Sequence, residues 1–431
     1  MNETDKISSF LYYGYLPDYQ PENISNIFSG IDSDNLFSVS KVNNNNESII
    51  VEQGIQALKT SFLKLINRYP DSSYIVPLSG GFDSRAILAA LLDFGLKDQI
   101  TTATFGVPGA WDFELGCHLA KELDLNHFCI DLNKVEVSTE KLVEIAKTGS
   151  LWTFLIDAYY NSLICREFGK TFVYWSGFLG DDLGDAEIIR MNNAQTNPWI
   201  YALNYFAKHE GSIFVKSIDL TAKDFNPTRC LPSNPILEGS VNDYRDQLNI
   251  FVYDHNYIKR VITFNNFNYQ TPFCSPDWVQ FILSVPRKYR AKKYIYKKIL
   301  FGAYPEIFSF PCTENCGGNL STHPIENKFR RALHRIRKNL PRYDPLWNHY
   351  HIFRNIKYID FDQAIRCRED FKSLVFENLQ DLKQRDKVDW LNLDSIWKEH
   401  HLKRANHGLA LMLLTALEIN LKVDEENVIV G

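Results

Sequence analysis

A glycine-rich segment stands between an expected β-strand and an expected helix. Residues 74–78 (YIVPL) form a short apolar run typical of a buried strand, and residues 86–94 carry the pattern of a strong helix that ends at Gly95. Between them lies SGGFDS, residues 79–84. Its two glycines allow a tight turn that brings backbone N–H groups close to an anion. This order predicts the first unit of an α/β fold, with a ligand site at the loop.

The alternation of strand and helix continues along the N-terminal half. Further strands are expected at 100–105, 127–132 and 172–175. Helices are expected at 50–69, 114–123 and 137–146. This alternation predicts an α/β fold with a doubly wound parallel sheet. Ligands of such sheets bind at the carboxyl ends of the strands, where the glycine-bearing loops 79–81 and 176–180 are expected to lie.

The strand signal fades after about residue 235, and the remainder of the chain is expected to be mainly helical. Helical patterns occur at 240–265, 277–285, 293–301, 326–340, 361–384 and 405–421. The chain therefore divides into three expected segments: an extension over 1–50, an α/β domain over 51–235, and a helical part over 236–431. The extension is expected to be irregular because it is rich in Asn, Ser and Asp.

Charge and composition argue against two classes of partner. The 47 Lys and Arg residues against 52 Asp and Glu give a net charge of −5, which disfavours nucleic-acid binding. No apolar run approaches the roughly 20 residues that span a bilayer, and no signal peptide is apparent, so we expect a cytoplasmic protein without membrane association. Most of the eight cysteines are expected to be small buried hydrophobes, and a disulfide framework is not expected. Cys312 and Cys316 are interpreted as loop cysteines rather than as a metal site.

The loop at 79–84 combines several features of a phosphate site. The helix that begins near Ser84 directs its positive end at the loop, and Ser79 and Ser84 add hydroxyl groups. Asp83 is unsuited to bind an anion directly and instead suggests a Mg²⁺ ion that bridges to phosphate oxygens. A serine-capped glycine turn without a ligand is the alternative, which the position between a strand and a strong helix disfavours.

The motif SGGFDS after a strand resembles the pyrophosphatase loop of the ATP-pyrophosphatase enzymes. The remainder of the chain narrows the resemblance to the synthetase domain of the asparagine synthetase family. Residues 176–182 (SGFLGDD) resemble the second loop of that family. Three later segments, in family order, resemble its remaining motifs: 271–277, 293–300 and 397–408. The resemblance covers residues 60–421 and implies a sheet of the adenine nucleotide α-hydrolase type.

The resemblance implies an AMP-forming ligase that uses ATP and Mg²⁺. Such an enzyme adenylates a carboxylate, releases pyrophosphate and transfers the acyl group to an amine or ammonia. Asp83 and Asp181 match the two Mg²⁺ carboxylates of the family, and Lys293 matches its phosphate-binding lysine; these are the implied catalytic residues. The implied nucleotide-binding residues are Leu78, Ser79, Gly80, Gly81, Asp83, Ser84, Thr104, Gly177 and Lys293. A solvated helix charge remains the alternative interpretation of Lys293, which lies among other lysines.

The chain also departs from the family. Position 2 is Asn2 rather than the nucleophilic cysteine of the glutaminase domain, and residues 10–17 resemble the connector that follows that domain, so we expect no glutaminase activity. Phe178 stands where asparagine synthetases have Glu and β-lactam synthetases have Tyr. Residues 313–315 (TEN) replace an expected lysine. We expect Phe178 either to form an apolar wall of the substrate pocket or to lie in the core beneath the loop.

Four functional hypotheses follow. The favoured one is a ligase that acts on a carboxylate other than aspartate, as in macrolactam formation of peptide natural products or amide formation in polysaccharide pathways. Its substrates would be a small-molecule or peptide carboxylate and an amine or ammonia, which a separate amidotransferase or carrier protein could supply. The alternatives are an ammonia-dependent asparagine synthetase, a tRNA-modifying ATP pyrophosphatase, and a nucleotide-binding protein without catalysis.

Overall fold

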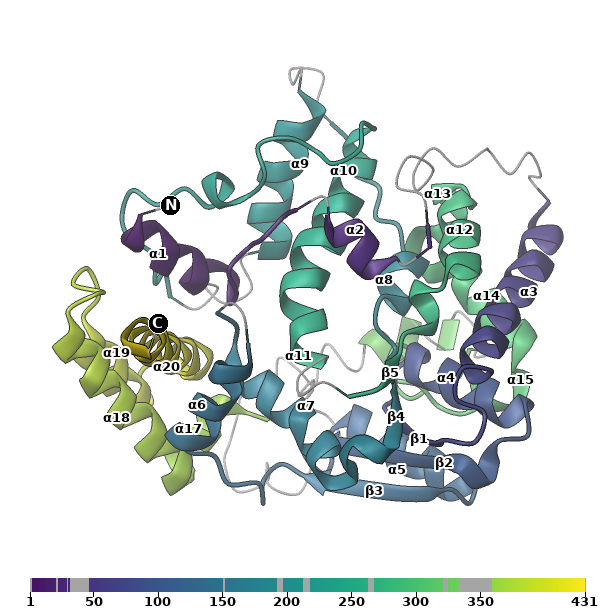
Figure 1. Ribbon diagram of the computed structural model, residues 1–431, viewed down its shortest axis with the longest axis horizontal. Coiled ribbons are helices and arrows are strands. Elements are labelled where there is room, and N and C mark those ends of the chain that lie inside the picture. The colour runs from purple at the N-terminus through teal and green to yellow at the C-terminus, as the bar shows by residue number, and fades with distance from the viewer. Residues whose placement is uncertain are drawn as a thin grey trace.

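A five-stranded, all-parallel sheet lies at the centre of the α/β part (Figure 1). The computed structural model describes residues 2–20, 22–28, 30–31, 46–149, 152–191, 197–211, 218–262, 267–320, 325–326, 328–332 and 359–430. The strands are β1 (Ser73–Pro77), β2 (Ile100–Gly106), β3 (Asn126–Asp131), β4 (Phe172–Trp175) and β5 (Tyr269–Gln270). Their order is β3-β2-β1-β4-β5, so the four expected strands and the parallel sheet are confirmed. β5 is a correction, because no strand was expected beyond residue 235.

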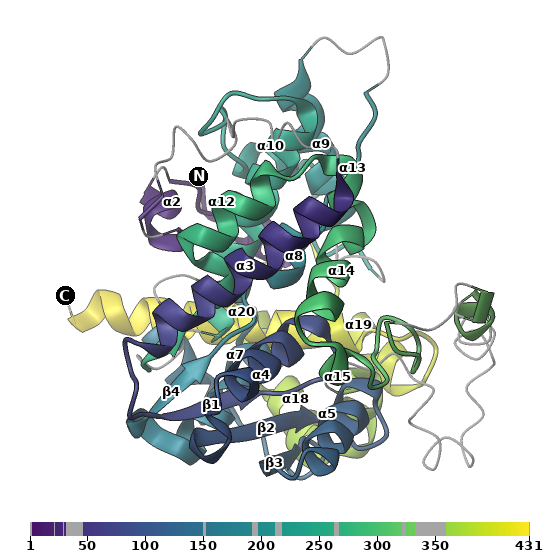
Figure 2. The ribbon, with the colours of Figure 1, turned by 90° about the vertical axis from the view of Figure 1, so that its right-hand side faces the viewer.

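Helices cover both faces of the sheet, as in a doubly wound fold. Alternate residues of β1 and β4 divide between the faces, because side chains in a strand point to opposite sides in turn. One face, with Val76 and Trp175, packs with α3 (Glu47–Ile66), α4 (Phe82–Asp93) and α5 (Trp111–Glu122). The opposite face, with Ile75, packs against Ile164 of α7 (Leu155–Phe168). Figure 2 looks onto α3, α4 and α5.

The remaining helices include those of the C-terminal part, which was expected to be helical, and several helices that precede it in the chain. They are α1 (Glu3–Tyr13), α2 (Glu22–Ile27), α6 (Thr139–Thr148), α8 (Gly180–Gly184), α9 (Pro198–Phe206), α10 (Val241–Leu248), α11 (Arg260–Ile262), α12 (Pro276–Ser284), α13 (Arg287–Arg290), α14 (Tyr294–Ala303), α15 (Pro305–Phe308), α17 (Phe361–Cys367), α18 (Glu369–Arg385), α19 (Leu393–His401) and α20 (Gly408–Val430). A π-helical stretch, Asn249–Lys259, joins α10 to α11. Of the helix expected at 326–340, residues 333–340 lie outside the described residues.

The expectation that residues 1–50 are irregular is wrong for α1. Asn2 caps this helix by accepting a hydrogen bond from the Asp5 N–H, and Gly14 ends it with a φ of 78°. Its apolar side, which includes Phe10, packs into the same core cluster as α20. Of the polar residues that suggested a loop, Asn2 acts as a cap, whereas Ser8 and Ser9 are buried. In addition, Lys6 pairs with Asp424 of α20 at 2.8 Å.

Two large core clusters stabilise the molecule. The first joins α1, α6, α7 and α10 to the C-terminal helices α17 to α20. The second joins α3, α4 and one sheet face to α12, α14 and α15. Each cluster contains residues from all three segments that the sequence suggested, so the packing crosses both expected boundaries. Among the described helices, none combines the length and apolarity needed to cross a membrane.

A buried histidine connects α19 to α20 and gives stability a dependence on pH. His400 is 0% exposed, and its Nδ1 accepts a hydrogen bond from the His407 N–H at 3.1 Å. Burial lowers the pKa of His400 from 6.5 to about 4. Between these values the unfolded chain binds the proton and the folded chain does not, so the free energy of unfolding falls as the pH decreases. We expect His400 to contribute at most about 3 kcal/mol to this loss.

Urea unfolding across this pH range measures the effect. His400→Asn should flatten the dependence, because the Asn Oδ1 can replace the Nδ1 acceptor and does not titrate. His401→Asn is the matched control, since His401 is the exposed neighbour on the same helix. His401→Asn should keep the full dependence on pH. If His400→Asn also loses stability with falling pH as steeply as the unsubstituted chain does, His400 is not the responsible group.

Candidate active site

The candidate site lies where the sheet topology changes direction. From β1 the chain first adds β2 and β3 on one side, and later adds β4 and β5 on the other. The connections after β1 and β4 therefore leave the carboxyl edge of the sheet side by side. In open α/β sheets this crevice is the usual position of a ligand. Both glycine loops that the sequence indicated lie here, on neighbouring strands.

The loop after β1 is folded tightly by its own serines. The Ser79 hydroxyl lies 3.1 Å from that of Ser84 and accepts a hydrogen bond from the Gly81 N–H at 3.2 Å. A second contact comes from residue 313, whose N–H donates to the Gly80 carbonyl at 3.0 Å. A Cβ atom at Gly80 would lie 1.9 Å from Thr313 Oγ1, so glycine is required for this approach. The loop thus begins α4 in a fixed conformation.

The loop after β4 packs directly against Asp83. A Cβ atom at Gly177 would lie 2.8 Å from Asp83 Cβ, and one at Gly180 would lie 2.4 Å from Asp83 Cγ. Between these glycines, Leu179 has a φ of 65°, a left-handed conformation that is uncommon for a branched side chain. The glycines of the second motif therefore serve to bring the backbone before Asp181 against the carboxylate of the first motif.

Asp83 is held by two hydrogen bonds at the base of the site. Its Oδ2 accepts from the Asp181 N–H at 2.9 Å, and its Oδ1 accepts from the Tyr296 hydroxyl of α14 at 2.6 Å. Burial, and then the charge of Asp181, raise the pKa of Asp83 well above its ordinary value. Burial likewise raises the pKa of Asp181, against the opposing effect of Lys293. The negative charges of Asp83 and Asp181 are therefore not fully balanced by the neighbouring positive charge.

Lys293 lies between two carboxylates rather than in solvent. Its Nζ lies 2.6 Å from Asp181 Oδ2 and 2.5 Å from Glu314 Oε1, and its side chain is only 18% exposed. Glu314 Oε2 also pairs with Lys297 at 3.0 Å. Burial alone would lower the pKa of Lys293, but Asp181 and Glu314 outweigh it and raise this pKa. The solvated-charge interpretation of Lys293 is thus inconsistent with its position.

The backbone before α14 turns Lys293 toward this position. Lys292 and Lys293 have φ values of 57° and 58°, in the left-handed region that non-glycine residues seldom adopt. Two consecutive residues of this kind cost free energy that the surrounding contacts must offset. The ion pairs of Lys293 with Asp181 and Glu314 are contacts of this kind, and such conformations concentrate at functional sites.

Leu78 and Thr104 form the far wall of the pocket. The Leu78 N–H donates to the Ala103 carbonyl at 2.8 Å, and the Leu78 carbonyl accepts from Thr104 Oγ1 at 2.7 Å. The Leu78 carbonyl retains a second lone pair that a ligand could use. The hydrogen bond from Thr104 thus holds the Leu78 carbonyl group in position.

The sequence-predicted site residues surround one pocket of about 1370 Å³. This exceeds the roughly 300–1,000 Å³ of a typical single-ligand site, so the pocket has room for more than one reactant. Phe178 borders the pocket, but it is 5% exposed and belongs to the second core cluster. The residues of the prediction that line the pocket are Leu78, Ser79, Gly81, Asp83, Ser84, Thr104, Gly177, Asp181 and Lys293.

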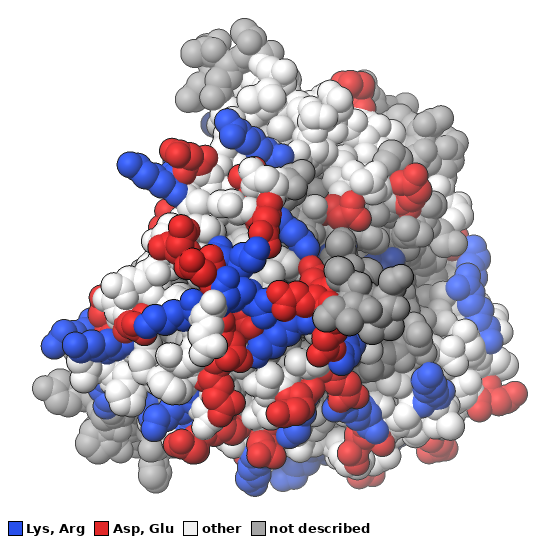
Figure 3. Space-filling view, turned by 60° about the vertical axis from the view of Figure 1, so that its left-hand side comes forward, with Lys and Arg blue, Asp and Glu red and all other residues white. Residues whose placement is uncertain are grey.

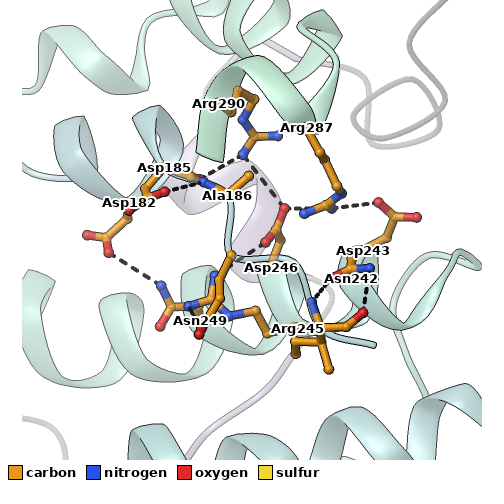
Figure 4. Close-up of polar contacts among 12 residues, drawn as sticks. Asp182, Asp185, Ala186, Asn242, Asp243, Arg245, Asp246, Asn249, Arg287 and Arg290 are labelled. Carbon is orange, nitrogen blue, oxygen red and sulfur yellow. Dashed lines mark hydrogen bonds and ion pairs between the residues drawn. The ribbon is translucent and has the colours of Figure 1, made fainter. Parts of the chain in front are cut away.

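A network of arginines and aspartates fixes the opposite side of the second loop (Figure 4). Asp246 of α10 pairs with Arg287 at 2.7 Å and with Arg290 at 3.7 Å. Arg290 in turn donates to the carbonyl groups of Leu183 and Asp185, at the end of α8. Nearby, Asn249 donates to Asp182 at 3.4 Å. Because α8 begins at Gly180, this network fixes the helix that carries Asp181 and Asp182.

Positive and negative side chains are mixed on one face of the molecule. On the face shown in Figure 3, the described Lys and Arg side chains are interspersed with Asp and Glu side chains.

Sequence reasoning did not single out Tyr296 or the residues of the Asp246 network, and it noted Glu314 only where a lysine was expected. Tyr296 lies within the segment 293–300 that the sequence indicated, but no local pattern shows that its hydroxyl group reaches Asp83. The position of Glu314 beside Lys293 depends on a loop contact that no local pattern indicates.

Neither a scan against protein-family models nor a search of curated proteins finds a match to this chain. The functional interpretation therefore rests on the geometry of the site and on the motifs described above.

The contact between Gly180 and Asp83 predicts a sensitive substitution. In Gly180→Ala the added methyl group would lie 2.4–2.7 Å from the Asp83 carboxylate, which must then move. A displacement of about 1 Å in a catalytic site can reduce the rate roughly 100-fold, and we expect such a loss in ATP–pyrophosphate exchange. Gly302→Ala is the control, because its methyl group meets only the ends of two aliphatic side chains, Ile55 at 3.0 Å and Val51 at 3.8 Å. Equal rates for both variants would contradict the assigned role of this contact.

Proposed function

We propose that this chain is an ATP-dependent, AMP-forming amide ligase. It would adenylate a carboxylate, release pyrophosphate and transfer the acyl group to an amine or ammonia. The observation that carries the proposal is the juxtaposition of Asp83, Asp181 and Lys293 at the switch point between β1 and β4. These are the three residues that the motif resemblance assigns to Mg²⁺ and phosphate.

The acidic pair suits a divalent cation. Asp181 Oδ1 is buried and, within the described part of the chain, has no hydrogen-bond partner. Burial raises the pKa values of Asp83 and Asp181, and the charge of Lys293 does not overcome this effect. We infer that these two carboxylates would hold Mg²⁺. When bound, Mg²⁺ supplies neutralisation of the phosphate charge.

The residues of the chain would contribute position and charge. In the first step a carboxylate oxygen attacks the α-phosphorus of ATP, and the bond to the bridging oxygen breaks as pyrophosphate leaves. The loop N–H groups and the Ser79 and Ser84 hydroxyls suit the pyrophosphate oxygens. Lys293 would exchange part of its contact with Glu314 for a phosphate oxygen. Electrostatic positioning of this kind is the main requirement of phosphoryl and nucleotidyl transfer.

In the second step the amine nitrogen attacks the acyl carbon, loses a proton, and AMP leaves. Glu314 is poorly suited to accept this proton, because Lys293 and Lys297 overcome the effect of burial and lower its pKa. We assign Glu314 to positioning Lys293. His323, another possible base from the sequence, lies outside the described residues. An amine that is already neutral when bound can attack without a base of the protein, and the proton that its nitrogen then loses can go to the phosphate of the departing AMP or to water.

The substrate side of the pocket combines apolar and polar walls. Phe178 borders it together with Ile188, Tyr253 and Ile258, and Arg245 and Asn249 border it as well. This lining and the volume favour a carboxylate that is bulkier and less polar near its carboxyl group than aspartate. The amine partner would be a small molecule, a peptide or ammonia from a separate amidotransferase.

Exchange of labelled pyrophosphate into ATP tests the proposal. The purified full chain is incubated with ATP, Mg²⁺ and one carboxylate at a time: aspartate, aromatic and aliphatic acids, uronic acids and peptide acids. We expect exchange that depends on a carboxylate other than aspartate. Exchange with aspartate alone would instead support an ammonia-dependent asparagine synthetase. Absence of exchange with every acid, while ATP still binds, would contradict the ligase and favour a nucleotide-binding protein.

A further inference from the structure

Three metal-ligating side chains meet at the outer edge of the sheet. Cys117 lies on α5, and His127 and Cys129 lie on β3, the edge strand. His127 and Cys129 are two residues apart, so they point to the same face of the sheet. Three ligand atoms, one from each of these side chains, lie within 4.8 Å of one another. The two sulfur atoms are 2.7 Å apart.

The hydrogen bonds around His127 prepare one of its nitrogens for a ligand. The Thr102 hydroxyl donates to the Asn126 carbonyl at 3.1 Å and lies 2.8 Å from His127 Nδ1. With its single proton directed to the Asn126 carbonyl, the Thr102 hydroxyl can accept a hydrogen bond from Nδ1–H of the corresponding His127 tautomer. The lone pair of His127 is then on Nε2. This nitrogen is buried and has no hydrogen-bond partner in the described part of the chain.

We propose that Cys117, His127 and Cys129 form a binding site for Zn²⁺. Two thiolates and a neutral imidazole are ligands that zinc prefers, and a threonine on Nδ1–H is the kind of outer partner that fixes the tautomer of a zinc-bound histidine. Cys129 is exposed, so the fourth position faces solvent, where water or an external ligand could complete the tetrahedron.

A metal accounts for this arrangement better than a disulfide does. Two sulfurs on one zinc lie about 3.8 Å apart, given Zn–S bonds of about 2.3 Å, so the thiols must separate by roughly 1 Å. The exposed side chain of Cys129 has room for this movement. A disulfide would require a smaller movement but would leave His127 Nε2 buried without a partner, which is unfavourable.

The site is separate from the acidic pair but lies behind the nucleotide wall. Cys129 is the register partner of Thr104 on β2, and Thr104 supports the Leu78 carbonyl. Zinc would join α5 to the edge strand across β2. The inference requires neither ATP nor ligase activity, so its test is independent of the proposed function.

Cobalt binding by the reduced full chain provides the test. Co²⁺ bound to thiolates gives a sulfur-to-cobalt charge-transfer absorption, which reports both ligand type and stoichiometry. We expect one Co²⁺ per chain, displaced by one Zn²⁺. Cys129→Ser should lower the affinity at least about 100-fold, and Thr102→Val about 10-fold through loss of the Nδ1 partner. Cys367→Ser is the matched control, because Cys367 is an exposed cysteine outside the cluster.

The proposal is overturned if the charge-transfer absorption is absent, or if it persists unchanged in Cys129→Ser. It is also overturned if His127→Gln binds zinc as tightly as the unsubstituted chain does. Circular dichroism on each variant establishes that the fold is retained. If Cys117 and Cys129 form a disulfide in air at saturating zinc as readily as without it, the pair is a redox couple rather than a zinc site.

Discussion

Asp83→Asn should abolish ATP–pyrophosphate exchange while leaving the protein folded. The amide retains the volume of the carboxylate; its oxygen can accept from the Asp181 N–H, and its NH2 group can donate to the Tyr296 hydroxyl, whose own proton then turns away. It removes the charge that we assign to Mg²⁺, and such a loss costs several kcal/mol of transition-state stabilisation. We expect a decrease in the exchange rate of about 1,000-fold or more.

The stability of Asp83→Asn, unlike its exchange rate, should not decrease. The pKa of Asp83 is raised, because the folded chain disfavours its charged form. As the pH rises above the ordinary pKa of an aspartate, this residue therefore reduces the free energy of unfolding. Thermal unfolding near neutral pH should therefore show an unchanged or higher midpoint, as is usual for a destabilising functional charge.

Asp182→Asn is the matched control for charge. Asp182 is the adjacent carboxylate on α8, and burial also raises its pKa, but its hydrogen bond goes to Asn249 rather than to Asp83. We expect exchange to fall far less than in Asp83→Asn. Comparable loss in both variants would indicate a general need for negative charge, and retained exchange in Asp83→Asn would refute the assignment of this residue.

Lys293→Gln should reduce exchange by about 100- to 1,000-fold, the range seen when one positioned donor to a developing charge is removed. The substitution leaves Asp181 and Glu314 without their shared cation, and it removes the group that we assign to phosphate. The loss should appear mainly in the rate at saturating ATP. Single-turnover formation of the acyl-adenylate measures it directly.

Lys297→Gln separates this role from general charge. Lys297 also pairs with Glu314, at 3.0 Å, but it is not paired with Asp181. Its substitution should lower the rate only slightly. Should the two lysine variants be equally impaired, the contribution of Lys293 would be to the net charge of the pocket and not to a particular contact.

The order of elements around the glycine loop could be predicted from the sequence, because a strand, a turn and a helix are local patterns. The same patterns placed β4 and the second loop. The site also needs contacts between distant positions, and these have no local signal. Asp181 and Lys293, for example, are 112 residues apart and meet only because α14 packs beside α8.

Two elements were missed for identifiable reasons. α7 is buried on almost all sides against the sheet and the C-terminal helices, so it lacks the amphipathic period by which a surface helix is recognised. β5 is only two residues long and depends on pairing with β4, since Gln270 stands beside Trp175. The cysteine cluster was overlooked because the cysteines were treated singly, although the pattern His127-x-Cys129 on a strand places both side chains on one face.

The packing of α1 against α20 determines when this protein can complete its fold. Residues near both ends of the chain share one core cluster, and Asp424 binds both Lys6 and the indole of Trp152. During synthesis, α1 leaves the ribosome long before its partner helix exists. Phe10 and Tyr13 can contact Trp152 and Phe206 earlier, but the part of α1 that packs against α20 stays uncovered until that helix follows. Such delayed, long-range pairing slows folding and increases the risk of aggregation.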